Sequence, residues 1–157
     1  MKNLSEKEKS YVAGFLDGDG CIMFQLIRRK DNRYGYEIRA SIVFYQHENN
    51  LYHLKWLKKF YRVGYIRKRD DKMLEYTIVG LKKVMPILKS LYPYLRLKKP
   101  HAKLALKIES ILSGKVNLRK FIKAAQLVDS FGKINFSKKR INTSEKLIKF
   151  LRNKNLI

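Results

Sequence analysis

The chain has 157 residues, a hydrophobic content of 45% and a formal net charge of +23, from 36 basic and 13 acidic residues. This length and composition favour one domain, residues 1–157, with enough apolar side chains for a core. The single cysteine, Cys21, excludes an internal disulfide and a cysteine-rich zinc site. The basic excess predicts nucleic acid as the partner; the alternative is a lysine-rich thermophile surface, but such surfaces usually balance lysine with glutamate.

Membrane and secretory roles are not expected. No apolar run is long enough to span a bilayer, and residues 1–6 lack the apolar centre of a signal peptide. We therefore expect no membrane partner and an intracellular, non-secreted protein, in an organelle or in a prokaryotic cytoplasm.

The first predicted element is a helix over residues 6–17. Ser5 and Glu8 have capping-box spacing, and Gly18 tolerates the backbone angles that end a helix. Small or short side chains recur along one stripe of this helix and would let another helix approach closely, as in a dimer interface; packing against a sheet of the same chain is the alternative. The stripe consists of Ser10, Ala13, Gly14 and Asp17.

The run AGFLDGDG over residues 13–20 places two carboxylates among three glycines in a strongly basic chain. Carboxylates facing a phosphate backbone repel it unless a cation lies between them, so this run predicts a divalent metal site. Residues i and i+2 do not share a helix face, so we assign Asp17 to the last turn, in a structural or interface role, and Asp19 to the metal. A calcium loop opening at Asp17 would need an acidic residue where Arg28 stands; a plain turn stays an alternative.

From Cys21 the apolar period changes to two, which predicts a hairpin with a return strand over residues 36–45 and a charged turn over residues 28–33. One face is apolar and the other is mixed; the alternative to a functional mixed face is a solvated outer face. Side chains able to read base edges lie on this face and in the turn: Gln25, Arg29, Asn32, Glu37, Arg39 and Ser41.

The downstream elements alternate between the two periods. A helix over residues 47–61 precedes a second hairpin, residues 63–68 and 74–79. A helix near Leu81 follows, and Pro86 should either kink this helix or shift its start. Three further helices are expected at about 101–112, 117–131 and 143–153. The expected DNA contacts continue into the second hairpin and into a basic link between the last two helices: Arg67, Arg69, Glu75, Lys138, Lys139 and Arg140.

This order predicts an α+β fold, αββαββα followed by C-terminal helices, with a twisted antiparallel sheet and helices on one face. The open face carries arginine and polar residues, and a ribbon of this kind fits a major groove about 12 Å wide.

The motif over residues 13–20 resembles the name motif of the LAGLIDADG homing endonucleases. The similarity covers nearly the whole chain and points to the homodimeric, single-motif, intron-encoded branch. It includes Gln46, the run VGY over residues 63–65, the run PYLRLKK over residues 93–99 and the run TSE over residues 143–145.

The resemblance implies a metal-dependent mechanism. Asp19, with the Gly18 carbonyl, would hold Mg²⁺, and Mn²⁺ or Ca²⁺ could occupy the same sites. Gln46 would hold the attacking water, and Lys98 would lie near the cleaved strand. Close relatives often carry a basic residue where this chain has Asn50, and the neighbouring Lys55 and His47 are the candidates for that role.

The resulting hypothesis is a site-specific double-strand DNA endonuclease for intron homing, a homodimer that acts on a long, partly palindromic site with Mg²⁺. The alternative is a non-cleaving nucleic-acid binder, either an RNA maturase or a DNA-binding regulator. The intact acidic residue, Asp19, favours cleavage.

Overall fold

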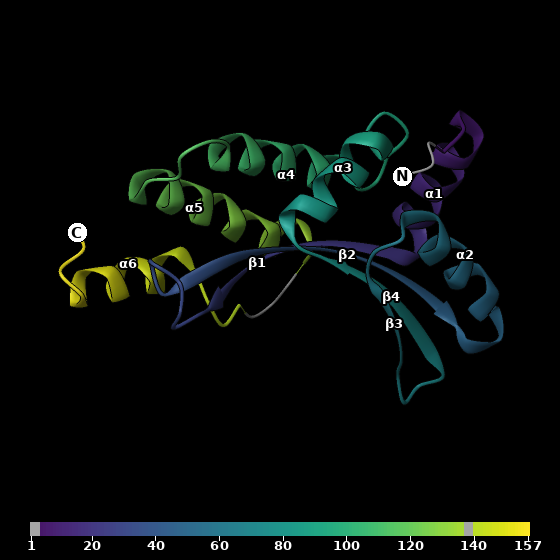
Figure 1. Ribbon diagram of the computed structural model, residues 1–157, viewed down its shortest axis with the longest axis horizontal. Coiled ribbons are helices and arrows are strands. Elements are labelled where there is room, and N and C mark those ends of the chain that lie inside the picture. Colours follow the sequence, from purple (N-terminus) through teal and green to yellow (C-terminus); the bar gives the residue numbers. More distant parts are fainter. Residues whose placement is uncertain (1–3, 137–139) are drawn as a thin grey trace. The chain divides into compact units, whose positions relative to one another are not determined.

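The computed structural model describes residues 4–136 and 140–157, so Lys138 and Lys139 of the predicted basic link lie outside the described residues. Figure 1 shows the helices and strands of the chain, which forms two compact units. The first contains Met1–Ile22 and Ala40–Ala102, and the second contains Met23–Arg39 and Lys103–Ile157. Among the helices that the structure describes, none is both long and apolar enough to cross a membrane.

The predicted α+β class with a four-stranded sheet is confirmed. The strand order is β1-β2-β4-β3, and β4 pairs antiparallel with both of its neighbours. Tyr45 on β2 lies opposite Glu75 on β4, which in turn lies opposite Arg67 on β3. The strands are β1 (Gly20–Arg28), β2 (Tyr36–His47), β3 (Tyr65–Lys68) and β4 (Met73–Val79).

In the first unit, apolar residues of β2 and β4 face the helices. Phe44 stacks on Phe15 of α1, with ring centroids 5.4 Å apart, and lies opposite Tyr76 in the strand register. Because side chains alternate along a strand, Tyr45, Glu75 and Arg67 lie on the other face. The helices of this unit are α1 (Glu6–Asp19), α2 (Leu51–Tyr61), α3 (Leu81–Leu91) and the first residues of α4 (Lys99–Leu112).

The prediction that the first helix ends at Gly18 is wrong. The capping box of Ser5 and Glu8 is present, but α1 continues through Gly18 to Asp19 and passes directly into β1 at Gly20. Gly20 is required by close approach, since a Cβ there would lie 2.8 Å from the carbonyl oxygen of Leu16. Both acidic residues of the motif therefore belong to the last turn of one helix.

The start of the second helix also differs from the prediction. Strand β2 continues through His47, and a 3₁₀ turn, η1 (Glu48–Asn50), precedes α2. The Nδ1 atom of His47 accepts the backbone N–H of Asn49 at 3.3 Å and caps this turn. Gln46 therefore lies at the end of a strand rather than at a helix start.

In the second unit, the part of the first hairpin within Met23–Arg39 packs against the C-terminal helices α5 (Leu118–Ile134) and α6 (Ser144–Asn153). Phe24 of β1 stacks on Phe131 of α5, with centroids 4.9 Å apart. Tyr36 of β2 meets Phe150 of α6 edge-on. These contacts place the apolar face of the hairpin against the helices, so Gln25 and Glu37 point to the other face.

Candidate active site

The last turn of α1 is tied to the segment before α4 by the carboxylate of Asp17. Its Oδ2 atom accepts the backbone N–H groups of Arg96 at 2.7 Å and Leu97 at 3.2 Å, and Oδ1 accepts that of Lys98 at 2.8 Å. The Lys98 ammonium then donates to the carbonyl oxygen of Asp17 at 2.5 Å. Three accepted N–H bonds and a cation at a helix C-terminus fix the segment containing Lys98 beside the motif.

Asp19 lies two residues further on and differs from Asp17. Its side chain is exposed, and it makes no hydrogen bond or ion pair with any residue that the structure describes. The last turn of α1 contains no basic residue, so the helix ends in two carboxylates and a set of carbonyl groups that carry partial negative charge. The electrostatic potential at this end of the helix therefore favours a bound cation.

The donor set suits a hard divalent ion. The Asp19 carboxylate and the Gly18 carbonyl both offer oxygen, the ligand atom that Mg²⁺ and Ca²⁺ prefer. Within the described ranges, no group of three or more His, Cys, Asp or Glu side chains could hold an ion. An ion at Asp19 would therefore need further oxygen ligands from outside the chain, such as water or phosphate.

Gln46 contacts Asn50 rather than Asp19. Its Oε1 atom accepts the Asn50 side-chain amide at 2.9 Å and the His47 backbone N–H at 3.1 Å. The Gln46 amide nitrogen has no hydrogen-bond partner among the described side chains and backbone groups. Lys55 is exposed on α2, and His47 is committed to its cap. The structure thus joins Gln46 to Asn50, and no hydrogen bond joins this pair to the Asp17–Lys98 contact.

Cys21 lies close to Lys98, and Tyr45 lies close to Cys21 and Glu75. Neither Cys21 nor Tyr45 was predicted as a site residue. Burial raises the pKa of the Cys21 thiol, and the nearby positive charge of Lys98 opposes that rise. Burial also raises the pKa of Tyr45, and Cys21 and Glu75 add to the rise. Cys21 directly follows the motif, and this adjacency was the only signal in the sequence.

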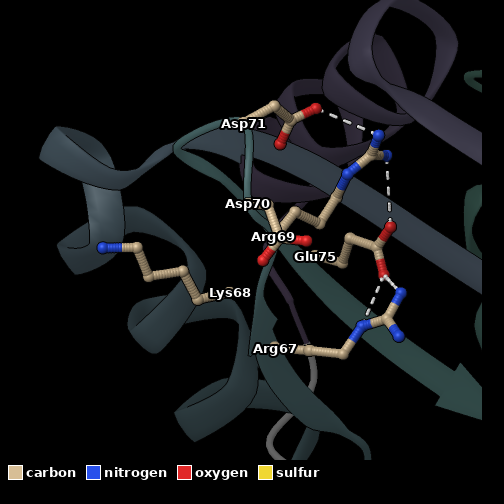
Figure 2. A pocket seen from close by; sticks show the side chains of 6 residues that line it. All are labelled: Arg67, Lys68, Arg69, Asp70, Asp71 and Glu75. Atoms are coloured by element: carbon tan, nitrogen blue, oxygen red, sulfur yellow. Dashed lines mark hydrogen bonds and ion pairs between the residues drawn. The ribbon is translucent and has the colours of Figure 1, made fainter.

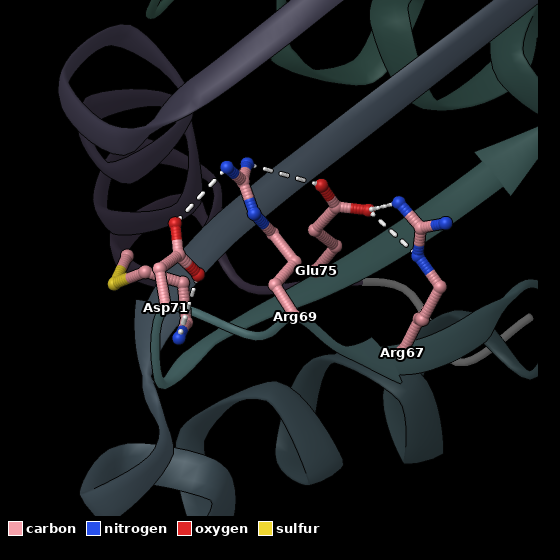
Figure 3. A network of polar contacts seen from close by, with 5 residues as sticks. Arg67, Arg69, Asp71 and Glu75 are labelled. Atoms are coloured by element: carbon pink, nitrogen blue, oxygen red, sulfur yellow. Dashed lines mark hydrogen bonds and ion pairs between the residues drawn. The ribbon is translucent and has the colours of Figure 1, made fainter.

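The predicted contacts of the second hairpin form a charged network around Glu75 (Figure 3). Glu75 Oε2 accepts Arg67 Nε at 3.2 Å and Nη2 at 2.7 Å, and Oε1 accepts Arg69 Nη1 at 3.3 Å. Arg69 Nη2 lies 3.0 Å from Asp71 Oδ2. The Glu75 bond and charge raise the pKa of Arg67, which stays a cation.

This network borders a shallow surface pocket of about 560 Å³ (Figure 2). Sequence reasoning missed Lys68, Asp70 and Asp71, although the charged run over residues 67–71 could have indicated them. Lys68 forms an ion pair with Glu48. The pocket is lined by Arg67, Lys68, Arg69, Asp70, Asp71 and Glu75.

The first hairpin has a similar arrangement around Glu37. Its Oε2 atom accepts Arg29 Nε at 2.9 Å, and its Oε1 lies 3.7 Å from Arg39 Nε. Gln25 and Asn32 are exposed, as a surface contact requires. Ser41 is not: the residue is 4% exposed in the central strand β2, so its prediction as a DNA contact is wrong.

Arg140, predicted as a surface contact, is half-buried and bonds within its own unit. Its guanidinium donates to the carbonyl oxygens of Val128 and Phe24, the latter at 2.5 Å. Burial lowers the pKa of this guanidinium, and the charge of Asp129 partly compensates. Arg140 therefore connects α5 and β1 inside the second unit.

The predicted interface stripe of α1 is only partly at the surface. Ala13 is fully buried within its own chain, because it faces the core, so its assignment to an interface is wrong. Ser10, Gly14 and Gly18 are exposed, and a Cβ on either glycine would meet no atom within 4 Å. Asp17 is half-buried and bonded to its own chain. The exposed stripe is therefore Ser10, Gly14 and Gly18, with Tyr11 beside it.

Comparisons with known proteins agree with this geometry. The LAGLIDADG endonuclease family matches residues 12–101. The chain is 35% identical over 136 residues to the DNA endonuclease I-CvuI of Chlorella vulgaris, covering 87% of this chain and 84% of the relative. It is 33% identical over 136 residues to the DNA endonuclease I-CreI of Chlamydomonas reinhardtii, covering 86% and 83%.

Solved structures give the same result. I-CvuI bound to the I-CreI target in the presence of Mg superposes with a TM-score of 0.89, at 32% identity and 97% coverage of both chains. I-CvuI bound to its own target in the presence of Ca gives a TM-score of 0.86, at 33% identity and 94% coverage of both chains. By sequence over most of its length and by fold, the chain belongs to the LAGLIDADG endonuclease family.

Proposed function

We propose that this chain is a site-specific double-strand DNA endonuclease that works as a homodimer and requires a divalent metal, Mg²⁺ in the first place. The observation that carries the proposal is the end of α1. There the exposed carboxylate of Asp19 has no partner among the described residues, although the chain has a net charge of +23. A basic chain gains little from such a carboxylate near phosphate unless a cation lies between them.

Asp19 and the Gly18 carbonyl would hold the ion. When bound, a divalent cation lowers the pKa of a coordinated water and neutralises charge on the phosphate. Asp19 also keeps the negative charge of the site fixed at a helix end, which prevents phosphate from binding there without metal. The DNA complexes of I-CvuI formed with Mg and with Ca support this choice of ligand.

Lys98 would stabilise charge that develops on the cleaved phosphate. Its position follows from Asp17, which holds the Lys98 backbone at 2.8 Å while the Asp17 carbonyl oxygen holds the ammonium at 2.5 Å. A preorganised cation needs little rearrangement during the reaction and therefore favours the transition state.

Gln46 would orient the attacking water through its side-chain amide. The bond from Asn50 to Gln46 Oε1, at 2.9 Å, fixes which way the amide of Gln46 points. In this orientation the Gln46 amide nitrogen can donate a hydrogen bond to the attacking water. Another group must accept the proton that the water loses. Asn50 would thus orient Gln46 for this role.

The two hairpins would lie in the major groove and read base edges. Arg67 and Arg29 are exposed on faces that point away from the helices, and arginine pairs bidentately with guanine O6 and N7.

Pairing of two chains along Ser10, Gly14 and Gly18 would bring two copies of Asp19 together, one for each DNA strand. In this arrangement residues 1–157 act as one endonuclease domain.

The test is a cleavage selection from a plasmid library with a randomised site, followed by sequencing of the cut ends. We expect double-strand cuts at related sequences with Mg²⁺ and none with a chelator. Asp19→Asn should bind the selected site at least as tightly as wild type and fail to cut it. Glu145→Gln, which makes the same charge change at an exposed position of α6, should cut normally. Normal cleavage by Asp19→Asn would contradict the proposal.

A further inference from the structure

The two hairpins share one arrangement, in which a glutamate on the second strand holds two arginines. Glu37 contacts Arg29 at 2.9 Å and Arg39 at 3.7 Å, and Glu75 contacts Arg67 at 2.7 Å and Arg69 at 3.3 Å. We call these the Glu37 triad and the Glu75 triad. Each occurs within one compact unit, and each spans the strand pair or turn of its own hairpin.

The Glu75 carboxylate lies beneath its arginines. The side chain of Glu75 is 13% exposed, whereas that of Arg67 is 64% exposed. Both Glu75 oxygens already accept guanidinium N–H groups. To accept an amine from a cytosine, Glu75 would have to give up these charge-assisted bonds, so it is badly placed to read a base itself.

The way Glu75 holds Arg67 leaves the reading edge of that arginine open. Glu75 occupies the Nε and Nη2 side of the Arg67 guanidinium, and the outer N–H groups of Nη1 and Nη2 remain for guanine O6 and N7. Arg69 is different, because Nη1 faces Glu75 and Nη2 faces Asp71. Arg67 is thus the arginine of the Glu75 triad that can read a base, whereas Arg69 is held by Glu75 and Asp71.

Each triad also limits attraction to phosphate that is independent of sequence. Two arginines alone carry a charge of +2, and the glutamate reduces this to +1 at the surface. Sequence-independent binding grows with the number of cations that meet phosphate. A fixed side chain also loses less rotational freedom when it meets its base.

We propose that Glu37 and Glu75 are specificity-determining positioning residues: they do not read bases but aim Arg29, Arg39 and Arg67 and suppress binding to unrelated DNA. This inference rests on the proposed function in so far as the chain recognises a particular DNA site. It predicts that removing a glutamate charge makes the protein bind more DNA with less selectivity.

The experiment compares Glu75→Gln, Glu37→Gln and the control Glu145→Gln, each in an Asp19→Asn background so that binding is measured without cleavage. Glu145 is exposed in the first turn of α6 and contacts no arginine in the described part of the chain. Dissociation constants are measured at one salt concentration for the selected site and for random-sequence duplex of equal length. Binding selections from a randomised library then give the base preference at each position.

We expect Glu75→Gln to tighten binding to random duplex and to reduce the ratio of specific to random affinity by about 10-fold. The lost preference should fall at the same base pairs that Arg67→Ala affects, and Glu75→Gln should have no further effect on preference when Arg67 is already alanine. Glu37→Gln should act likewise on the base pairs affected by Arg29→Ala or Arg39→Ala. Glu145→Gln should leave the ratio unchanged.

Three outcomes would overturn the inference. An unchanged affinity ratio in Glu75→Gln and Glu37→Gln would mean that the glutamates only adjust charge. Loss of preference at base pairs that no arginine variant affects would mean that the glutamates read bases directly. Absence of any DNA sequence preference in the parent chain would overturn the inference and the proposed function together. If wild type showed sequence preference but did not cut DNA with metal, only the proposed nuclease activity would be overturned.

Discussion

Asp17 and Lys98 bind each other twice: the Asp17 carboxylate accepts the Lys98 backbone N–H at 2.8 Å, and the Lys98 ammonium donates to the Asp17 carbonyl oxygen at 2.5 Å. The two residues are 81 positions apart in sequence. This double contact joins the motif helix to the segment that carries the proposed catalytic cation. It separates the roles of the two motif carboxylates, since Asp17 holds the protein together while Asp19 faces outward.

Asp17→Asn should therefore lower stability as well as activity. Asparagine has one carbonyl oxygen and no charge, so it cannot replace all three accepted N–H bonds, and we expect a loss of about 1–3 kcal/mol in the free energy of unfolding. Cleavage should fall because Lys98 is no longer fixed. Urea denaturation and single-turnover cleavage measure the two effects. Asp19→Asn is the matched control and should unfold like wild type; equal stability of the two variants would show that Asp17 is not structural.

Gly14→Leu should prevent pairing without unfolding the chain. A Cβ at Gly14 would meet no atom within 4 Å, and replacing glycine inside a helix gains up to about 1 kcal/mol of helix propensity. The bulk would instead obstruct a second helix, so we expect a monomer that makes no double-strand cut. Sedimentation on and off DNA gives the mass. Gln126→Leu, at an exposed position of α5, controls for an added apolar side chain. A Gly14→Leu variant that dimerises with wild-type affinity would show that the interface lies elsewhere.

The first hairpin could be predicted because the alternation of β1 lies within one stretch of sequence, although β2 is buried on both faces over residues 40–44. Phe24 and Ile22 face inward and Gln25 outward, as alternation requires. The helices beyond residue 80 were recoverable for the same reason, since their apolar spacing is local. The sequence named Arg67 and Glu75 only as DNA contacts, so their register and their ion pair were not predicted.

Two other features depended on contacts that no local pattern encodes. Gly18 is a plausible helix end, yet α1 continues past it because the Lys98 ammonium satisfies the Asp17 carbonyl from a distant segment. The inward turn of Arg140 likewise depends on carbonyl groups of Val128 and Phe24, which only the folded chain brings within reach. A charge run in a sequence shows that cations are present but not which of them reach the surface.

Arg140→Met provides a direct test of that inward placement. The change removes a half-buried cation that bonds two carbonyl groups and lies near Asp129, so we expect a loss of about 1–3 kcal/mol in unfolding free energy. Affinity for DNA should change no more than in Lys133→Met, an exposed control on α5. A loss of DNA affinity at unchanged stability would instead support the surface contact predicted from sequence.

His53 should make stability depend on pH. Its ring lies among Tyr11, Phe15 and Trp56, with the Tyr11 hydroxyl 3.3 Å from Nε2. Burial lowers the pKa of His53 below its ordinary value of 6.5. The unfolded chain therefore binds a proton more readily than the folded chain, and the free energy of unfolding should fall as the pH falls below about 6.5.

His53→Phe keeps an aromatic ring and removes the titrating group, so its stability should decline less between pH 7 and pH 5 than that of wild type. Urea denaturation at several pH values measures both slopes. His47 and His101 remain in both proteins, so the difference between the slopes isolates His53. The variant also loses the contact with the Tyr11 hydroxyl, but this loss shifts the free energy of unfolding by the same amount at every pH. Equal slopes would show that His53 binds its proton as readily in the folded chain as in the unfolded one.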